Sequence, residues 1–170
     1  LTTDITEVED KLGHVEILKK EFSTNGLLAY KIENLVKDLE ELTNEYLAEL
    51  SDGRFSLEFV VLNDKLNVEI DDNGKTVDIL ALSAGELARV NTSTLLAIRK
   101  LMSSISKSRI NVLFLDEVTN VLDEQGKERL VEILLREENL NTYIVSHGWT
   151  HPLLSKIDII KEQKISRLDG

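Results

Sequence analysis

The run from Asn111 to Leu115 is almost wholly apolar and ends in two adjacent carboxylates, Asp116 and Glu117. A short apolar run without polar alternation predicts a strand buried on both faces, as in the parallel sheets of α/β proteins. Such sheets place ligands beside the carboxyl ends of their strands. The sequence therefore predicts an α/β fold with a candidate site at Asp116 and Glu117. A strand followed by an acidic turn is the simpler interpretation.

The elements predicted around this strand have the order expected of such a fold. Two β-prone stretches separated by turn residues, and a third after another turn, predict antiparallel strands at 55–62, 66–70 and 77–80. Helices then alternate with strands, which predicts a mostly parallel sheet with flanking helices. These later elements are helices at 83–104 and 124–137 and strands at 110–115, 142–145, 157–160 and 164–168.

The first 50 residues have helical periodicity. Apolar residues at heptad spacing from Leu1 to Phe22 are typical of the end of a coiled coil. After a break at 23–26, a second apolar stripe from Leu28 to Leu50 predicts an amphipathic helix. Packing of both stripes against a core is an equally good interpretation. We expect a coiled-coil end and connecting helix at residues 1–50 and an α/β lobe at residues 51–170.

Composition limits the partners that this chain can have. Of 170 residues, 42% are apolar, and the formal net charge is -11, which argues against a nucleic-acid footprint over the whole surface. Cysteine is absent, which excludes disulfides, and no apolar run is long enough to span a membrane. We therefore expect a soluble, cytoplasmic protein without a membrane partner, in which any contact with DNA is local.

One window departs from the acidic average. Residues 87–115 contain no Asp or Glu. This window is either an ordinary solvated helix and loop or a strip that faces phosphate or DNA. Its basic residues are Arg89, Arg99, Lys100, Lys107 and Arg109.

Two positions besides Asp116 and Glu117 carry candidate functional groups near predicted element ends. Asp123 precedes the helix at 124–137, where aspartate is a good N-cap. His147 follows the strand at 142–145, where an imidazole can contact a phosphate oxygen, although a lone histidine is more often structural. Asp116 would hold Mg²⁺ through water, and Glu117 would orient or deprotonate an attacking water.

Ser83 and Glu86 are three residues apart at the start of a predicted helix, which is the spacing of a capping box. That structural role is sufficient to explain both residues. The helix N-terminus, with the Ser83 hydroxyl and the Gly85 N–H, would also be able to bind an anion.

Taken in order, these segments resemble the motif set of the ABC ATPases from about Phe55 onward. The segment 82–86, Leu-Ser-Ala-Gly-Glu, resembles the signature motif, and Asp116 with Glu117 resembles Walker B. Asp123 then falls in the D-loop, and His147 matches the H-loop. The resemblance implies that ATP is contacted by Ser83, Ala84, Gly85, Glu86 and Asp123. It also implies that Asp116 holds Mg²⁺ and that Glu117 and His147 are catalytic.

Particular residues favour one branch of this family. The family usually has glycine at the position of Ala84, and the added methyl group is expected to be tolerated. Transporters usually have Gln at the position of Glu86 and Pro at that of Val118. The chain is therefore more similar to the SMC, RecN and SbcC group, in which a coiled coil separates the two halves of each head.

No phosphate-binding P-loop is evident. Gly74-Lys75-Thr76 resembles the end of one, but the pattern requires glycine where this chain has Glu69, and Asn73-Gly74 predicts a hairpin turn. The resemblance therefore implies that a separate N-terminal lobe supplies Walker A. It also implies that a second head completes the site around ATP.

The function implied is that of the C-terminal half of an ATPase head, which hydrolyses ATP for DNA repair or recombination together with a nuclease subunit, similar to SbcC and its phage relatives. The fragment alone is expected to be almost inactive. A condensin-like, cohesin-like or RecN-like tethering head and a non-catalytic dimerisation module are the alternatives.

Overall fold

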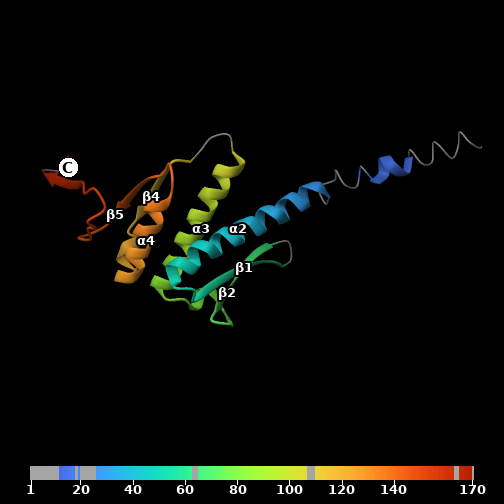
Figure 1. The fold of residues 1–170 in the computed structure, drawn as a ribbon, viewed down its shortest axis with the longest axis horizontal. Helices are drawn as coiled ribbons and strands as arrows, with labels where there is room; N and C mark the ends of the chain where they lie inside the picture. The colour runs from blue at the N-terminus through green and yellow to red at the C-terminus, as the bar shows by residue number, and fades with distance from the viewer. Residues whose placement is uncertain are drawn as a thin grey trace, which may run out of the picture.

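The computed structural model describes residues 12–17, 19, 26–62, 65–106, 110–162 and 165–169 (Figure 1). Much of the predicted heptad pattern, including Leu1, Ile5, Val8 and Phe22, lies outside these residues. Helices and strands are mixed along the chain, which confirms the α/β class. They are α2 Leu27–Ser51, β1 Phe55–Leu62, β2 Lys65–Asp72, β3 Lys75–Val77, α3 Ala84–Ile105, β4 Val112–Asp116, α4 Glu124–Arg136, β5 Asn141–Val145, β6 Asp158–Glu162 and β7 Ile165–Asp169.

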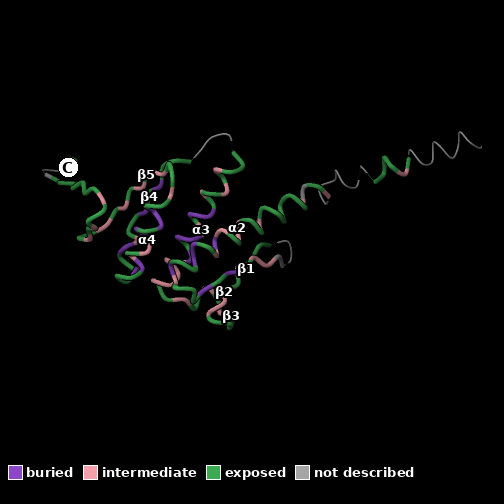
Figure 2. The backbone as a smooth tube through the Cα atoms, viewed as in Figure 1, coloured by how far each residue is buried: buried purple, intermediate pink, exposed green. Residues whose placement is uncertain are grey.

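Helix α2 packs against β1, α3 and α4 through its C-terminal half (Figure 1). Its apolar stripe is buried at Tyr46, Leu47 and Leu50 but exposed at Ile32. Figure 2 shows the same change along the helix, from a mostly exposed first half to a largely buried end. The predicted amphipathic helix is present, and its first half presents apolar side chains to solvent. None of the described helices is long and apolar enough to cross a membrane.

Side chains of α2 also satisfy the backbone of β1. The Leu57 N–H donates to Oδ1 of Asn44, and Asn44 Nδ2 donates to the Leu57 carbonyl, both at 2.8 Å. Two residues along the strand, the Phe59 N–H donates to Oε2 of Glu40 at 2.7 Å. An open strand edge would otherwise invite pairing with another chain. These bonds fix the sheet to the helix.

The strands β1, β2 and β3 form an antiparallel sheet in that order. The third strand is shorter than predicted, because β3 ends at Val77 and residues Ile79–Ala81 form one turn of 3₁₀ helix. The Asp78 side chain accepts a hydrogen bond from the Leu80 N–H at 2.8 Å, and a local bond of this kind competes with a strand. The strand prediction for 77–80 is therefore wrong after Val77.

The residues that resemble the end of a P-loop lie in and after the turn between β2 and β3. Asn73 and Gly74 both have positive φ, 53° and 87°, as in a tight two-residue hairpin turn. Lys75 and Thr76 begin β3 rather than a helix. Gly74 thus lies in a hairpin turn, as predicted, and Lys75 and Thr76 belong to the strand that follows it.

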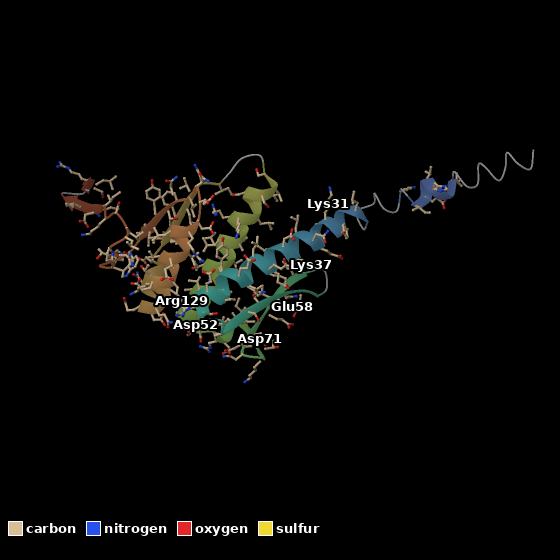
Figure 3. All side chains as sticks on the ribbon, in the orientation of Figure 1. Lys31, Lys37, Asp52, Glu58, Asp71 and Arg129 are labelled. Atoms are coloured by element: carbon tan, nitrogen blue, oxygen red, sulfur yellow. The ribbon has the colours of Figure 1, made fainter. Side chains whose placement is uncertain are left out.

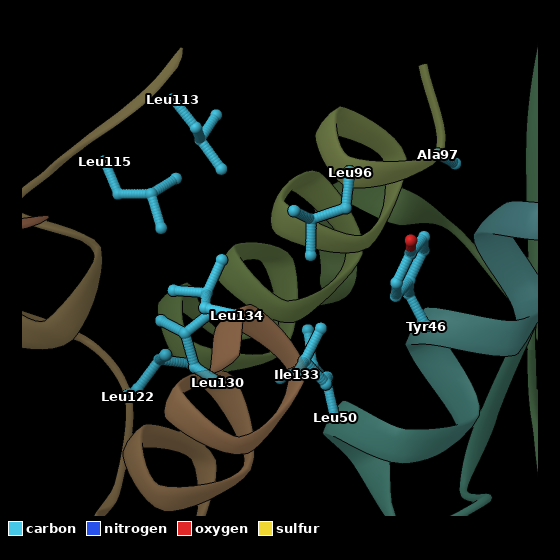
Figure 4. Close-up of a cluster of buried hydrophobic side chains, with 10 residues drawn as sticks. All are labelled: Tyr46, Leu50, Leu96, Ala97, Leu113, Leu115, Leu122, Leu130, Ile133 and Leu134. Atoms are coloured by element: carbon cyan, nitrogen blue, oxygen red, sulfur yellow. The ribbon is translucent and has the colours of Figure 1, made fainter. Parts of the chain in front are cut away.

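The strands β4 and β5 pair in parallel. On one face, buried side chains of β4 meet those of α3 and α4 in a single cluster (Figure 4). In β4, Leu113 and Leu115 point into this core, where they meet Leu96 of α3 and Leu130 of α4. The described residues contribute only these two strands to the parallel sheet, and β6 and β7 form a separate antiparallel hairpin. The remaining members of the buried cluster are Tyr46, Leu50, Ala97, Leu122, Ile133 and Leu134.

The other face of β4 and β5 is apolar but uncovered. Phe114 and Tyr143 stack with ring centroids 5.0 Å apart, and they are 66% and 50% exposed. Val112 and Val145 lie on the same strands and are also exposed. Parallel sheets are normally covered on both faces, so an apolar face as exposed as this one is unusual for such a sheet.

A polar cluster joins α2, α3 and the end of α4. Arg99 forms an ion pair with Glu137, and the Tyr46 hydroxyl donates to Glu137 Oε1 at 2.6 Å. Burial, and then the bond to Glu137, raises the pKa of Tyr46 well above its ordinary value. The Arg99 side chain is only 11% exposed. Lys100 lies nearby with its ammonium over the Tyr46 ring.

The basic window of the sequence is therefore not a continuous surface strip. Arg89 and Arg99 are mostly buried and paired with acids. Both interpretations of the window, a solvated surface and a DNA-facing strip, are therefore wrong for Arg89 and Arg99. Lys107 and Arg109 lie outside the described residues.

A second polar contact ties α4 to the end of α2. Arg129 Nη2 lies 2.8 Å from Asp52 Oδ1, and its Nη1 donates to the Glu49 carbonyl at 2.8 Å. Figure 3 labels Arg129 and Asp52 at this junction. Asp52 has a φ of 59° and terminates α2.

Candidate active site

The carboxyl ends of β4 and β5 bring three of the predicted site residues together. The parallel ladder pairs Asp116, the last residue of β4, with Val145. One residue further on, the Glu117 N–H donates to the Val145 carbonyl at 2.9 Å. His147 follows β5, and its Nε2 atom lies 3.1 Å from Oε1 of Glu117. The sheet therefore places Asp116, Glu117 and His147 at one edge.

The backbone at Glu117 sets the direction of its side chain. Glu117 has φ 55° and ψ 11°, a left-handed conformation that non-glycine residues adopt infrequently. It breaks the strand and begins a one-turn 3₁₀ helix, in which the Asn120 N–H donates to the Glu117 carbonyl at 3.0 Å. Such backbone conformations are common at functional sites.

These three side chains are open to solvent. Glu117 is 56% exposed and His147 80% exposed. A Mg²⁺ ion in proteins is commonly held by one or two carboxylates, water and substrate phosphates. No group of three potential metal ligands occurs among the described residues. Asp116 and Glu117 offer carboxylate oxygens, which are the ligand type that Mg²⁺ takes.

A hollow of about 550 Å³ lies beside this edge. Thr119, in the turn after β4, lines it, and the Thr119 side-chain oxygen is buried without a hydrogen-bond partner among the described residues. The other lining residues are Asn120, Glu124, Lys127, His147, Gly148 and Trp149.

The predicted capping box is present at the start of α3. The Ser83 N–H donates to Glu86 Oε2 at 2.9 Å, and the Glu86 N–H donates to Ser83 Oγ at 3.3 Å. The Ser83 hydroxyl also donates to Glu86 Oε2 at 2.7 Å. The bonds from Ser83, with a smaller contribution from Arg54, lower the pKa of Glu86.

Gly85 packs directly against residues 119–123 of the same chain, which we call the D-loop segment after the motif that they resemble. A Cβ atom at Gly85 would lie 2.8 Å from the Val121 carbonyl oxygen. Only a residue without a side chain fits this approach unless the backbone moves. Ala84, the first residue of α3, is exposed, so its methyl group makes no such contact.

Asp123 connects the D-loop segment to α3. It is the N-cap of α4, as predicted, and accepts from the Gly126 N–H at 2.7 Å. Arg89 Nη2 lies 2.7 Å from the same carboxylate, and Arg89 Nε donates to the Leu50 carbonyl at 2.9 Å. The Gly126 bond, and then Arg89, lowers the pKa of Asp123.

The predicted site residues thus form two groups. One is the sheet edge, with Asp116, Glu117 and His147. The other is the junction of the α3 N-terminus with the D-loop segment, with Ser83, Ala84, Gly85, Glu86 and Asp123. No hydrogen bond or ion pair described for residues 26–162 joins the two groups. Their roles in binding and catalysis stay predictions.

Two arginines of the second group were missed by sequence reasoning. In the sequence, Arg89 stands out only as part of the basic window, and Arg54 belongs to no motif. Arg89 follows Gly85 by one helical turn, so its place behind the signature segment was open to prediction. The contact of Arg54 with Glu86 crosses 32 residues and has no local signal.

No family model matches the chain. Among curated proteins, it is 43% identical over 162 residues to a probable exonuclease subunit 2 of Escherichia phage T5, an alignment that covers 95% of this chain and 26% of that protein. It is 31% identical over 105 residues to a DNA double-strand break repair Rad50 ATPase of Pyrococcus abyssi (61% and 12%). It is 25% identical over 175 residues to a component of the nuclease SbcCD of Clostridium acetobutylicum (95% and 13%). The chain thus spans about a quarter or less of these relatives.

Solved structures share the fold. One, from a study of ATP-driven dimerization and DNA-stimulated activation of SMC ATPases, superposes with a TM-score of 0.65 at 18% identity, covering 82% of this chain and 87% of that chain. A second, an Smc head bound to the C-winged helix domain of ScpA, gives 0.61 at 20% identity, covering 79% and 42%. Together, the motifs, the fold and these relatives identify the chain as a region of an ATPase head of the SMC and SbcC type.

Proposed function

We propose that this chain is the C-terminal half of a head that dimerises around ATP and hydrolyses it to drive DNA repair or recombination. The observation that carries the proposal is the contact between Glu117 and His147 at the end of β4, next to Asp116. A carboxylate beside an imidazole can receive a proton from water and be held in place while it does so.

Each residue of the sheet edge then has one task. Glu117 orients the attacking water and accepts its proton at a carboxylate oxygen. His147 holds that carboxylate and offers a ring nitrogen to the transferred phosphate. Asp116 binds Mg²⁺ through water, and the ion, when bound with ATP, neutralises charge on the phosphates.

The uncovered face of β4 and β5 supports an N-terminal lobe as the partner that supplies Walker A. The described residues hold no glycine-rich phosphate loop, and the stacked Phe114 and Tyr143 are exposed where a second layer would lie. The N-terminal part of the same protein is the occupant we propose for this face. Its phosphate loop would then lie near Asp116.

The second group of residues serves the opposing head. Ser83 and the N-terminus of α3 would contact the nucleotide held by a second copy, with Ala84, Gly85 and Glu86 shaping that surface. Asp123 would lie at the same interface. The hydroxyl, the helix N-terminus and the backbone N–H groups are suited to an anionic phosphate.

The first 50 residues would connect this head to a coiled coil. Helix α2 is buried near its C-terminal end but exposes Leu27, Tyr30 and Ile32 in its first half. An ascending helix from the N-terminal half is the partner we propose for these residues. The division into residues 1–50 and 51–170 stays a prediction, and Tyr46 and Leu50 of α2 pack in the core of the second part.

The relative with 43% identity is named an exonuclease subunit, and this favours a nuclease partner over a chromosome-tethering role. The SMC neighbours share the fold at lower identity, so a condensin-like or RecN-like head is the second candidate. For either role we propose a cytoplasmic, DNA-associated complex.

Replacing Glu117 by Gln in the intact protein tests the proposal. The amide keeps the shape of the side chain but cannot accept the proton. We expect unchanged ATP binding, a longer-lived ATP-bound head dimer and a fall in single-turnover hydrolysis of about 100-fold or more. Unchanged single-turnover hydrolysis would remove Glu117 from the catalytic role.

A further inference from the structure

Arg54 joins the β1–β2 sheet to the N-terminus of α3. Its Nε and Nη2 atoms donate to the two oxygens of Asp72, at 2.8 and 2.7 Å. Its remaining nitrogen, Nη1, lies 2.8 Å from Glu86 Oε1. The guanidinium also lies 4.4 Å from the centroid of the Phe55 ring. Asp72 and Phe55 therefore hold the guanidinium in place, and its third nitrogen, Nη1, pairs with Glu86.

The hydroxyl proton of Ser83 is used in a hydrogen bond to the Glu86 carboxylate. A carboxylate has no proton to donate, so the 2.7 Å contact between Ser83 Oγ and Glu86 Oε2 is a bond from the hydroxyl to the carboxylate. Ser83 has only one hydroxyl proton. While Glu86 holds that proton, Ser83 cannot donate it to a phosphate oxygen.

Arg54 acts on the opposite oxygen of the same carboxylate. The positive charge draws electron density toward Oε1 and weakens Oε2 as an acceptor. It also offsets a negative charge that would repel a phosphate approaching the α3 N-terminus. Both effects make it easier for the Ser83 hydroxyl to exchange its hydrogen bond to Glu86 for one to an anionic ligand.

We propose that Arg54 is a positioning residue of the signature segment, which partly offsets the charge of Glu86 so that the Ser83 hydroxyl can donate to the nucleotide phosphate of the opposing head. Arg54 itself does not touch that phosphate. The inference rests on the proposed dimerisation around ATP and adds the residue that regulates one of its contacts.

The test is a double-mutant cycle in the intact protein, with a non-hydrolysable ATP analogue as the ligand and head dimerisation measured by analytical ultracentrifugation. Arg54→Ala is compared in two backgrounds, one with Glu86 and one with Glu86→Gln, which has no charge to neutralise. Arg54→Lys tests whether the charge suffices. Arg129→Ala, which removes another arginine paired with an aspartate near the same end of the lobe, is the control.

We expect Arg54→Ala to raise the analogue concentration for half-maximal dimerisation about fivefold when Glu86 is present, and by less than about twofold with Glu86→Gln. Arg54→Lys should recover much of the loss, and Arg129→Ala should leave the value unchanged. A structural role for Arg54 alone would give equal losses in both backgrounds and would overturn the proposal, as would no loss in either. If the unmutated protein does not dimerise with the analogue at all, both the proposed function and this inference are wrong.

Discussion

The Nε2 atom of His147 lies 3.1 Å from Oε1 of Glu117, although thirty residues separate them. We predict that His147→Ala slows single-turnover ATP hydrolysis in the intact protein by about 100-fold, because the carboxylate loses the group that holds it. The affinity for ATP should change much less. Both side chains are largely exposed, so the free energy of unfolding should change by less than about 0.5 kcal/mol.

His151 supplies the control for that variant. It also contacts a glutamate, Glu128, at 3.1 Å, but its side chain is buried. His151→Ala should lower stability and leave the hydrolysis rate of bound ATP unchanged. Equal losses of hydrolysis in the two variants would contradict a specific role for His147.

Gly85→Ala should destabilise the 170-residue chain. The new Cβ atom would lie 2.8 Å from the Val121 carbonyl oxygen, so the start of α3 or the D-loop segment must move. We expect a loss of about 1 to 3 kcal/mol in the free energy of unfolding, measured by urea denaturation. At Gly13 a Cβ atom would have no neighbour within 4 Å, so Gly13→Ala should be neutral or slightly stabilising. Equal effects of the two substitutions would show that the approach to Val121 is not tight.

Arg99→Ala should also lower stability, whether or not the protein binds DNA. The substitution leaves the Glu137 carboxylate, which is 14% exposed, without its cation. Breaking a buried pair in this way should cost about 3 kcal/mol in urea denaturation. Lys100 is half-exposed and 3.9 Å from Glu45, so Lys100→Ala should cost less than about 1 kcal/mol. A change of DNA affinity in Arg99→Ala at unchanged stability would restore the DNA-facing interpretation.

The 170-residue chain alone should bind ATP very weakly, because it offers Asp116 and His147 but no phosphate loop or its lysine. Isothermal titration calorimetry with Mg²⁺ and ATP should detect no micromolar binding. Adding the separately produced N-terminal lobe should restore binding and some hydrolysis. Ser83→Arg, which places a bulky side chain where the opposing phosphate would lie, should then abolish that hydrolysis. Micromolar binding by the chain alone would contradict a half-site.

Sequence alone determined the parts of the site that depend on neighbouring residues. The apolar run before Asp116 determined a strand, but the prediction that both of its faces are buried was wrong, because only Leu113 and Leu115 are buried while Val112 and Phe114 are exposed. The spacing of Ser83 and Glu86 determined a capping box. Asp123 was predicted as an N-cap for the same reason. Each of these features depends on periodicity or on hydrogen bonds within a few residues, so a single segment contains the information.

Tertiary structure decided which side chains meet. It placed His147 in contact with Glu117, packed Gly85 against the Val121 carbonyl, and paired Arg54 with Glu86. It also buried Arg99, which the sequence left as part of a basic window. A charged side chain takes its partner from whichever element packs beside it. That choice depends on how α2, α3 and the two sheets assemble, and no local pattern encodes it.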